Sequence, residues 1–320
     1  MKAFVLNELY KYPELQSTTF PTLGDDEVYI KINASSINHR DLWIVKGMYP
    51  GIILNTILGS DACGVSGENT FVINPGLFWG DNPHCQSSAF QVLGMPSPGT
   101  FAEHIAINQK YLYACPAHLT EIEAAAIPLA GITAYRALFK RALVKKEDKV
   151  LISGIGGGVA LFAMQFAIAA GCEVIVTSSS DYKIAEAIDL GAHAGYLYTN
   201  PDWYKELIHD FGGVDVIIDG ACGQGFNNLV KTCNPGARIS FYGGSAGKID
   251  GLNPQTIFWK QITIAGSTMG SDQDFAEMID FISEHQIKPV IDSIFPFDQI
   301  TEGFKRMESG LQFGKIVFQH

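Results

Sequence analysis

The chain has 320 residues, enough for about two domains, and its 47% hydrophobic and 17% charged residues exclude a disordered protein. With 22 Lys and Arg against 33 Asp and Glu it carries a net charge of −11, which argues against general binding to nucleic acids or anionic membranes. The 33 glycines form no triplet repeat, so a collagen-like chain is excluded as well. A small-molecule enzyme is the expected class.

The six cysteines are scattered and include no C-x-x-C pair, which argues against a disulfide framework and against a cysteine-rich zinc site. No apolar stretch reaches the length of about 18 residues that a membrane span needs. The first residues also lack the apolar region of a signal peptide. We therefore expect a soluble cytoplasmic protein.

The chain up to about residue 120 is predicted to be rich in β-structure. Short runs of strand-forming residues alternate there with Gly, Pro and Asn. Strands are expected at Lys2–Leu6, Val28–Ile32, Thr70–Ile73 and Glu103–Ile107.

After residue 120, apolar runs of strand length alternate with segments of helix length. Strands are expected at Lys149–Ser153, Glu173–Thr177, Val214–Asp219 and Arg238–Tyr242, and helices at Val159–Ala170, Tyr182–Leu190 and Phe226–Thr232. This alternation predicts βαβ units and a doubly wound parallel sheet of the α/β class. Short strands return from about residue 287 and end with Lys315–Phe318. We therefore expect a β-rich domain, residues 1–121 plus 287–320, with an α/β domain, residues 122–286, inserted in it.

A glycine-rich turn follows the first strand of the α/β domain and opens a helix. Its candidate cofactor-binding residues are Gly154, Gly156, Gly157, Gly158 and Val159. A turn without Cβ atoms lets backbone amides and the helix N-terminus approach a pyrophosphate. The strict G-x-G-x-x-G pattern is not met, because Val159 replaces the third glycine, but Gly154-x-x-Gly157-x-x-Ala160 fits the spacing. A tight turn without a ligand is the alternative, and the strand–turn–helix order favours a dinucleotide site.

The end of the next strand bears on the choice of dinucleotide. An NAD site usually has an Asp or Glu there to bind the ribose 2′-hydroxyl. Here the strand ends in Ser178-Ser179-Ser180, and Lys183 follows in the next turn. Hydroxyl groups and a cation suit the 2′-phosphate of NADP(H), which we favour over NAD(H). Asp181 is a carboxylate close to this position and so speaks against a 2′-phosphate, but we interpret it as a helix N-cap. The alternative for Lys183 is a solvated helix residue.

Several segments of the chain match motifs of a known family. They are Asn38–Pro50 (NHRDLWIVKGMYP), Leu58–Asp61 (LGSD), Gly99–Glu103 (GTFAE), Ala124–Ala134 (AAAIPLAGITA) and Phe313–Val317 (FGKIV). With the glycine-rich turn they make the chain resemble the medium-chain dehydrogenase/reductases, across essentially its whole length. The most similar branch is the one called zinc-type alcohol dehydrogenase-like, close to the quinone oxidoreductases. The resemblance implies a Rossmann doubly wound parallel sheet inserted in a GroES-like β-rich domain.

The resemblance also bears on zinc. In zinc-dependent relatives a Cys occupies the position of Asn38, a His that of Ser60, and a third ligand falls near Leu129 or Ala130. None of these residues replaces the ligands that catalytic zinc requires. The structural zinc loop of such relatives carries four cysteines, whereas only Cys85 lies in the corresponding region here. We therefore expect no zinc.

Without zinc, the chemistry that fits is hydride transfer to an acceptor that is already electrophilic, such as a quinone or an enone. The resemblance places Asn38, Asp41 and Tyr49 in the catalytic cleft and Thr133 beside the nicotinamide. The Tyr49 phenol is the candidate hydrogen-bond donor to the developing oxyanion. A buried aromatic in a Tyr-Pro turn is the alternative for Tyr49, and bracing of the loop is the alternative for Asp41.

Further roles follow from position in the family. Trp43 stands where relatives carry an aromatic that lines the substrate pocket, and His39 is a candidate acid. The alternative for Trp43 is packing in the core, and the alternative for His39 is a purely structural role. Tyr198 matches an aromatic near the adenosine phosphate, while Phe241 and Gly243 lie at the sheet edge where the nicotinamide ribose would approach. The alternative for Tyr198 is packing against the sheet. The alternative for the segment that contains Phe241 and Gly243 is a simple turn.

Two features concern assembly and shape. The strand Ile262–Ala265 lies where relatives pair across a two-fold axis, which implies a homodimer. Between Gly67 and Thr70 relatives carry several more residues, so a hairpin of the β-rich domain is expected to be trimmed.

The leading hypothesis is a zinc-independent oxidoreductase that transfers a hydride from NADPH to a quinone or an α,β-unsaturated carbonyl. An NAD(H)-linked alcohol dehydrogenase of the same fold is one alternative. A dinucleotide-binding sensor that has lost catalysis is the other. The retained Asn38, Asp41, Tyr49 and glycine-rich turn argue for an active enzyme.

Overall fold

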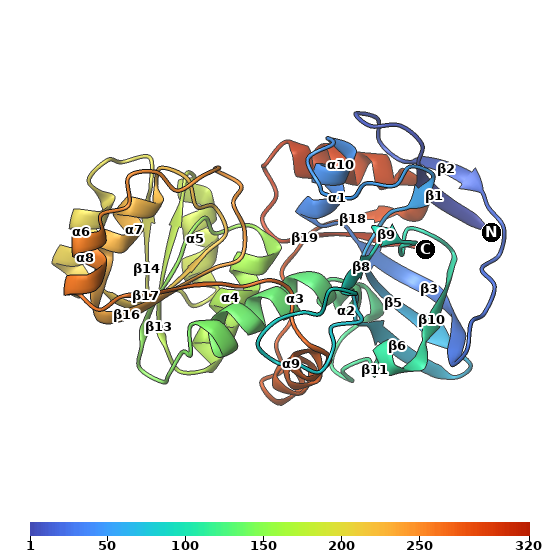
Figure 1. Cartoon of the computed structure of the whole chain (residues 1–320), viewed down its shortest axis with the longest axis horizontal. Coiled ribbons are helices and arrows are strands. Elements are labelled where there is room, and N and C mark those ends of the chain that lie inside the picture. The colour runs from blue at the N-terminus through green and yellow to red at the C-terminus, as the bar shows by residue number, and fades with distance from the viewer. The chain divides into compact units, whose positions relative to one another are not determined.

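The computed structural model describes all 320 residues, and the chain divides into two compact units (Figure 1). Unit 1 consists of residues Met1–Ile132 and Gly270–His320, and unit 2 of residues Thr133–Met269. The expected arrangement, an α/β segment inserted in a β-rich chain, is confirmed. The inserted unit is shorter than expected, since it runs from residue 133 to 269 rather than from 122 to 286.

The inserted unit is shorter because α9 (Asp272–Glu284) packs on unit 1. The ring of Phe275 lies 4.8 Å from the ring of Tyr113, measured between centroids. A Cβ added at Gly131 would lie 2.8 Å from the sulfur of Met278, so α9 also sits directly against α3 (Pro128–Tyr135). Residues 272–284, which were expected to belong to the α/β domain, thus form an amphipathic helix whose apolar side packs on unit 1.

The main sheet of unit 1 has the strand order β11-β6-β5-β3-β19-β18, and β10 pairs with β3. Its strands are β3 (Glu27–Ser36), β5 (Asp61–Ser66), β6 (Asn69–Ile73), β10 (His104–Asn108), β11 (Leu112–Ala114), β18 (Ile291–Pro296) and β19 (Lys315–Gln319). The small sheets β2-β1-β4 and β7-β8-β9 comprise β1 (Lys2–Leu6), β2 (Glu14–Ser17), β4 (Thr56–Ile57), β7 (Gly76–Leu77), β8 (Gln91–Leu93) and β9 (Pro96–Ser97). Besides α3 and α9, the helices are α1 (His39–Val45), α2 (Glu121–Ala125) and α10 (Ile300–Glu308).

Strand β19, from the end of the chain, pairs antiparallel with β3, from its beginning, and Val317 lies opposite Ser36. This pairing brings Lys315 next to the end of β3 at Ser36, and α1 begins three residues later, at His39. The strands β5 and β6 form a hairpin in which Ser66 pairs with Asn69. Its two-residue connection has Gly67 at φ +60°, a backbone conformation that favours glycine.

Phe101 is a fully buried residue of one of the two hydrophobic clusters of unit 1. Its ring makes edge-to-face contacts with the rings of Phe318 (5.5 Å) and Phe304 (6.3 Å), which suit the quadrupoles of aromatic side chains. Gly59 has φ +91°, and a Cβ there would lie 2.5 Å from the Phe101 ring, so glycine is required. This close contact fixes the backbone that carries Ser60 and Asp61.

Unit 2 has a sheet with the strand order β14-β13-β12-β15-β16-β17, in which every pairing is parallel. The strands are β12 (Lys149–Ile152), β13 (Glu173–Ser178), β14 (Ala194–Leu197), β15 (Val214–Asp219), β16 (Cys233–Phe241) and β17 (Thr263–Gly266). The helices are α4 (Gly158–Ala169), α5 (Asp181–Asp189), α6 (Trp203–Phe211), α7 (Phe226–Thr232) and α8 (Pro254–Trp259). The strand order reverses between β12 and β15, which is the switch point where open α/β sheets bind ligands.

None of the helices combines the length and the hydrophobicity that crossing a bilayer requires.

Candidate active site

A buried carboxylate, Asp61 at the start of β5, joins four segments of unit 1. Its Oδ2 accepts hydrogen bonds from Ser36 Oγ (2.9 Å), Asn38 Nδ2 (2.8 Å) and Lys315 Nζ (2.9 Å). Its Oδ1 accepts a hydrogen bond from the backbone N–H of Leu129 (2.8 Å), near the start of α3. Because Asp61 is fully buried, these bonds form at low dielectric, where they strengthen one another.

Lys315 supplies the positive charge of this cluster. Its ammonium donates to Asp61, to Asn38 Oδ1 (2.7 Å) and to the carbonyl of Ile37 (3.1 Å), so each of its three protons has an acceptor. Asn38 Nδ2 also donates to Ser60 Oγ (3.2 Å), and the Asn38 amide is therefore held at both ends. Lys315 was not predicted as a site residue, although a charged residue at the start of the apolar strand Lys-Ile-Val-Phe is a signal of a buried ion pair.

The side chains of this cluster do not fit a metal ion. Asn38 and Ser60 offer a neutral amide and a neutral hydroxyl, and the charge of Asp61 is balanced by Lys315. Nowhere in the chain do three or more His, Cys, Asp or Glu side chains form a group that could hold a metal.

Asp41, the third residue of α1, caps the backbone of its own helix. Its Oδ2 accepts a hydrogen bond from the N–H of Asn38 (2.9 Å). Burial raises the pKa of Asp41 to about 6, and the nearby guanidinium of Arg40 opposes this shift. Its Oδ1 is buried without a hydrogen-bond partner. The structure thus brings Asp41 and Asn38 together, and this contact fits the alternative in which Asp41 braces the loop.

Tyr49 contacts Arg40, the second residue of α1. Its half-buried ring packs against the core of unit 1, and its Oη accepts a hydrogen bond from Arg40 Nε (3.4 Å). The guanidinium carbon of Arg40 lies 5.0 Å from the centre of the Tyr49 ring. Arg40 was not among the site residues predicted from the sequence. Trp43 is half-buried, whereas His39 is exposed.

In unit 2 the glycine-rich turn is held between neighbouring strands. Gly154 N–H donates to Thr177 Oγ1 (3.2 Å), and Ile155 N–H donates to the Thr177 carbonyl (2.8 Å). A Cβ added at Gly154 or Gly157 would meet no atom within 4 Å, so open space lies above both. Gly157 is the N-cap of α4 and has no side chain to cap the helix, so amides of its first turn are open to an anion. Such a turn fits the pyrophosphate of a dinucleotide.

Lys183 folds back over this turn. A Cβ added at Gly156 would lie 2.8 Å from Lys183 Cδ and 3.3 Å from its Nζ. Ser178 is buried and Ser179 exposed, at the end of β13. The interpretation of Asp181 as a helix N-cap is wrong, because Ser180 holds that position and its Oγ accepts a hydrogen bond from Lys183 N–H (3.5 Å).

Asp219 ends β15 at the switch point of the sheet. It accepts a short hydrogen bond from Ser153 Oγ at the end of β12, and its Oδ2 accepts one from the N–H of Cys222 (2.7 Å). The carboxylate therefore ties together the two strands between which the strand order reverses. A Cβ at Gly243 would lie 2.7 Å from the carbonyl oxygen of Gly220, so a close backbone contact requires glycine there.

The remaining predicted cofactor residues of unit 2 have different surroundings. Tyr198 N–H donates to the Ser178 carbonyl (3.0 Å), which places Tyr198 beside the end of β13. Tyr198 is 48% exposed. Phe241 is half-buried and makes an edge-to-face contact with Phe226 (6.3 Å). Thr133 is buried, and its Oγ1 lies 3.9 Å from the sulfur of Met269.

Family models match both parts of the chain. A model described as zinc-binding dehydrogenase matches residues 158–284, and one described as alcohol dehydrogenase GroES-like domain matches residues 24–117.

Individual relatives match nearly the whole chain. A zinc-type alcohol dehydrogenase-like protein, YogA, of Leptosphaeria maculans is 33% identical over 340 aligned residues, covering 96% of this chain and 95% of its own. The human quinone oxidoreductase is 28% identical over 302 residues, covering 91% and 88%. A crystal structure titled as an NAD-dependent alcohol dehydrogenase superposes with a TM-score of 0.94 at 32% identity and covers all of both chains.

Proposed function

The chain belongs to the medium-chain dehydrogenase/reductase superfamily, and on that premise we propose that it is a zinc-independent reductase that transfers a hydride from NADPH to a quinone or an α,β-unsaturated carbonyl compound. The observation that carries the proposal is the closed Asp61–Lys315 ion pair, with Asn38 and Ser60 where zinc-dependent relatives have metal ligands. A quinone or an enone is electrophilic by its own electronic structure, so its reduction does not depend on a Lewis acid.

Bound at the glycine-rich turn, the nicotinamide dinucleotide supplies the hydride. The open space above Gly154 and Gly157 and the uncapped start of α4 support a pyrophosphate site there. The Lys183 ammonium and the Ser178 hydroxyl are the groups that we propose for the 2′-phosphate of NADPH. The exposed ring of Tyr198, next to Ser178, is proposed to cover the adenosine.

Tyr49 is the residue that we propose to act on the acceptor, by donating a hydrogen bond from its phenol to the oxygen that becomes negative as the hydride arrives. Asn38 has both of its amide ends engaged, and Asp41 is fully buried. Both are therefore proposed to position α1 and its loop rather than to bind the acceptor. Thr133, Phe241 and Gly243 are proposed to contact the nicotinamide end of the cofactor.

A screen of cofactors and acceptors tests the proposal. The protein is dialysed against EDTA, and oxidation of NADPH and of NADH is followed with a quinone, an enone and an aldehyde. The proposal expects turnover of the quinone or the enone that prefers NADPH and survives the chelator. Activity that needs NAD(H), an alcohol and added zinc would favour the alcohol dehydrogenase alternative. Tight NADPH binding without turnover of any acceptor would favour the sensor.

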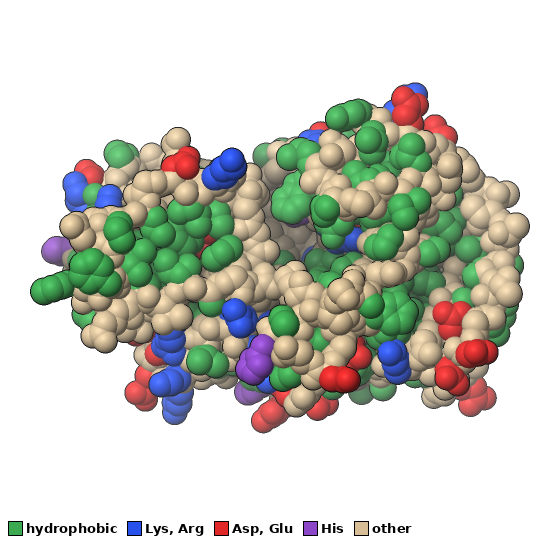
Figure 2. Space-filling view, viewed as in Figure 1, with side chains coloured by type: hydrophobic (Ala, Val, Ile, Leu, Met, Phe, Trp, Pro, Cys, Tyr) green, Lys and Arg blue, Asp and Glu red, His purple; other side chains and the backbone are tan.

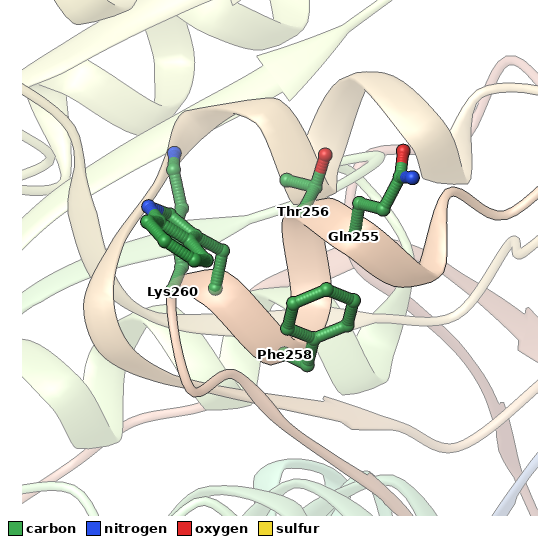
Figure 3. A pocket seen from close by; sticks show the side chains of 5 residues that line it. Gln255, Thr256, Phe258 and Lys260 are labelled. Atoms are coloured by element: carbon green, nitrogen blue, oxygen red, sulfur yellow. The ribbon is translucent and has the colours of Figure 1, made fainter.

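We also propose a homodimer formed through the edge strand β17. This strand pairs only with β16, and its other edge carries no strand of the same chain. The neighbouring helix α8 has a shallow surface hollow lined by Gln255, Thr256, Phe258, Trp259 and Lys260 (Figure 3). The side chains of Phe258 and Trp259 are 62% and 83% exposed, and hydrophobic side chains stand out at this end of unit 2 (Figure 2). Exposed apolar groups of this size beside an open sheet edge support an interface.

The dimer is tested by light scattering after size-exclusion chromatography. The natural protein is expected at twice the mass of the chain, and Ile264→Pro, which removes an N–H from the edge strand, is expected to shift it to the monomer. A monomeric natural protein would overturn this part of the proposal.

A further inference from the structure

Arg40 is a buried cation whose place in unit 1 is fixed by backbone groups. Its Nη1 donates to the carbonyl of Leu93 (2.7 Å) and its Nη2 to the carbonyl of Met95 (3.1 Å). The side chain is 7% exposed and forms no ion pair at these contacts. Because an arginine fork is planar and rigid, two carbonyls at these distances set both the position and the plane of the guanidinium.

The third donor of this guanidinium reaches Tyr49. Arg40 Nε lies 3.4 Å from Tyr49 Oη, and the guanidinium carbon lies 5.0 Å from the centre of the ring. The contact uses the phenol oxygen as an acceptor, so the phenol's own proton points away from Arg40 and stays available for donation. A cation beside the phenol also strengthens it as a hydrogen-bond donor.

We propose that Arg40 is a positioning residue of the acceptor site, which holds the Tyr49 phenol so that its O–H is directed at the oxygen of the bound quinone or enone. This inference rests on the proposed function, in which Tyr49 donates that hydrogen bond. Tyr49 is only half-buried, and its core contacts lie on the ring, so the contact with Arg40 is what fixes the hydroxyl end.

A purely structural role for Arg40 is the competing explanation, because the same guanidinium ties the segment of Leu93 and Met95 to α1. It also lies close enough to Asp41 to influence that carboxyl group. Either of these effects acts without Tyr49. A double-mutant cycle on kcat separates them from an effect that passes through the phenol.

The cycle compares the natural protein with Tyr49→Phe, Arg40→Met and the double variant, using NADPH and the best acceptor. Tyr49→Phe is expected to lower kcat about 100-fold, as the loss of one oxyanion donor does. Arg40→Met is expected to lower kcat about tenfold with KM little changed, and to cost less than about twofold when Phe already replaces Tyr49. Arg40→Lys, which keeps the charge but loses the fork, is expected to recover part of the loss.

Two measurements guard against misfolding. NADPH affinity, measured by fluorescence titration, is expected to stay unchanged in all the variants, because Arg40 belongs to unit 1 and the glycine-rich turn to unit 2. Arg306→Met is the matched control: Arg306 makes a two-pronged ion pair with Asp292, and its loss is expected to leave kcat unchanged. If Arg40→Met does not fold, the cycle is run with Arg40→Lys.

The outcomes separate the inference from the function on which it rests. If the fold losses in kcat of the two single variants multiplied in the double variant, Arg40 would act independently of Tyr49. Its proposed role would be overturned, and the proposed reaction would stand. If Tyr49→Phe had the kcat of the natural protein, Tyr49 would not be the hydrogen-bond donor. The proposed role of Arg40 in positioning Tyr49 would then be wrong as well. An absence of turnover with every acceptor would overturn the proposed function and, through it, this inference. Loss of the Arg40 effect in the Tyr49→Phe background supports the inference.

Discussion

The ammonium of Lys315 lies 2.9 Å from the carboxylate of Asp61, and both side chains are buried. Lys315 comes from the last strand of the chain and Asp61 from β5, so the pair joins the two chain segments that make up unit 1. A buried ion pair is weak evidence of net stabilisation, because desolvation offsets the attraction. Removing only one partner is costly, because the other charge is left buried and alone.

Lys315→Met is therefore expected to lower the free energy of unfolding of unit 1 by about 3–5 kcal/mol. The double variant with Asp61→Asn should recover part of this loss, because no isolated charge remains. Urea unfolding followed by circular dichroism measures both. Lys305→Met is the control, since Lys305 pairs with Glu302 on the surface and should cost less than about 1 kcal/mol. Equal losses in the two lysine variants would contradict the argument.

Lys183→Glu is expected to weaken NADPH binding at least about tenfold and to change NADH binding much less, because only NADPH carries the 2′-phosphate. Isothermal titration with the two dinucleotides measures the ratio. Lys205→Glu is a control, because Lys205 lies on the exposed side of unit 2 and pairs with Asp202. If Lys183→Glu weakened both dinucleotides equally, Lys183 would belong to the pyrophosphate and not to the 2′-phosphate.

The two glycines Gly156 and Gly157 allow a matched test of the turn. Gly157 has φ −81° and open space where a Cβ would go, so Gly157→Ala should leave stability unchanged. Its methyl group would fill space proposed for the pyrophosphate, and binding of both dinucleotides should fall. Gly156 has φ +125° and Lys183 against it, so Gly156→Ala should cost about 1–3 kcal/mol of stability. Thermal unfolding and dinucleotide titration separate the two effects. A Gly157→Ala variant that binds as the natural protein does would place the pyrophosphate elsewhere.

The sequence was sufficient to predict the elements of unit 2 because their patterns are local. The strand Val214–Asp219 and the helix Phe226–Thr232 have the expected bounds. β16 begins earlier than expected, at Cys233 rather than Arg238, because Pro235 and Gly236 lie inside the strand although they are typical of turns.

The contacts of the site were less predictable, because they join residues far apart in the chain. Lys315 meets Asn38 across 277 positions, and Arg40 meets the carbonyls of Leu93 and Met95. No local pattern encodes either pairing, and that of Lys315 arises only when β19 inserts beside β3. Resemblance to a family located Asn38, Asp41 and Tyr49, whereas their partners required the structure.

His320 gives unit 1 a pH dependence of definite sign. It lies against Phe297, with ring centroids 4.1 Å apart, and its Nε2 is 2.8 Å from Ser35 Oγ. Burial lowers its pKa from 6.5 to about 3. Between these values the unfolded chain binds a proton that the folded chain does not, so stability is full above about pH 6.5 and falls as the pH is lowered.

The loss assigned to His320 is at most about 2 kcal/mol between pH 7.5 and pH 5. His320→Gln should remove it, so the variant's free energy of unfolding should depend less on pH than that of the natural protein. Asp41, with its pKa raised to about 6, acts with the opposite sign, but it is present in both proteins and cancels in the difference. Urea unfolding at the two pH values measures the effect, with the exposed His209→Gln as the control. A His320→Gln variant whose stability changes with pH as much as the natural protein's would show that the neutral, buried imidazole is not the source of the dependence.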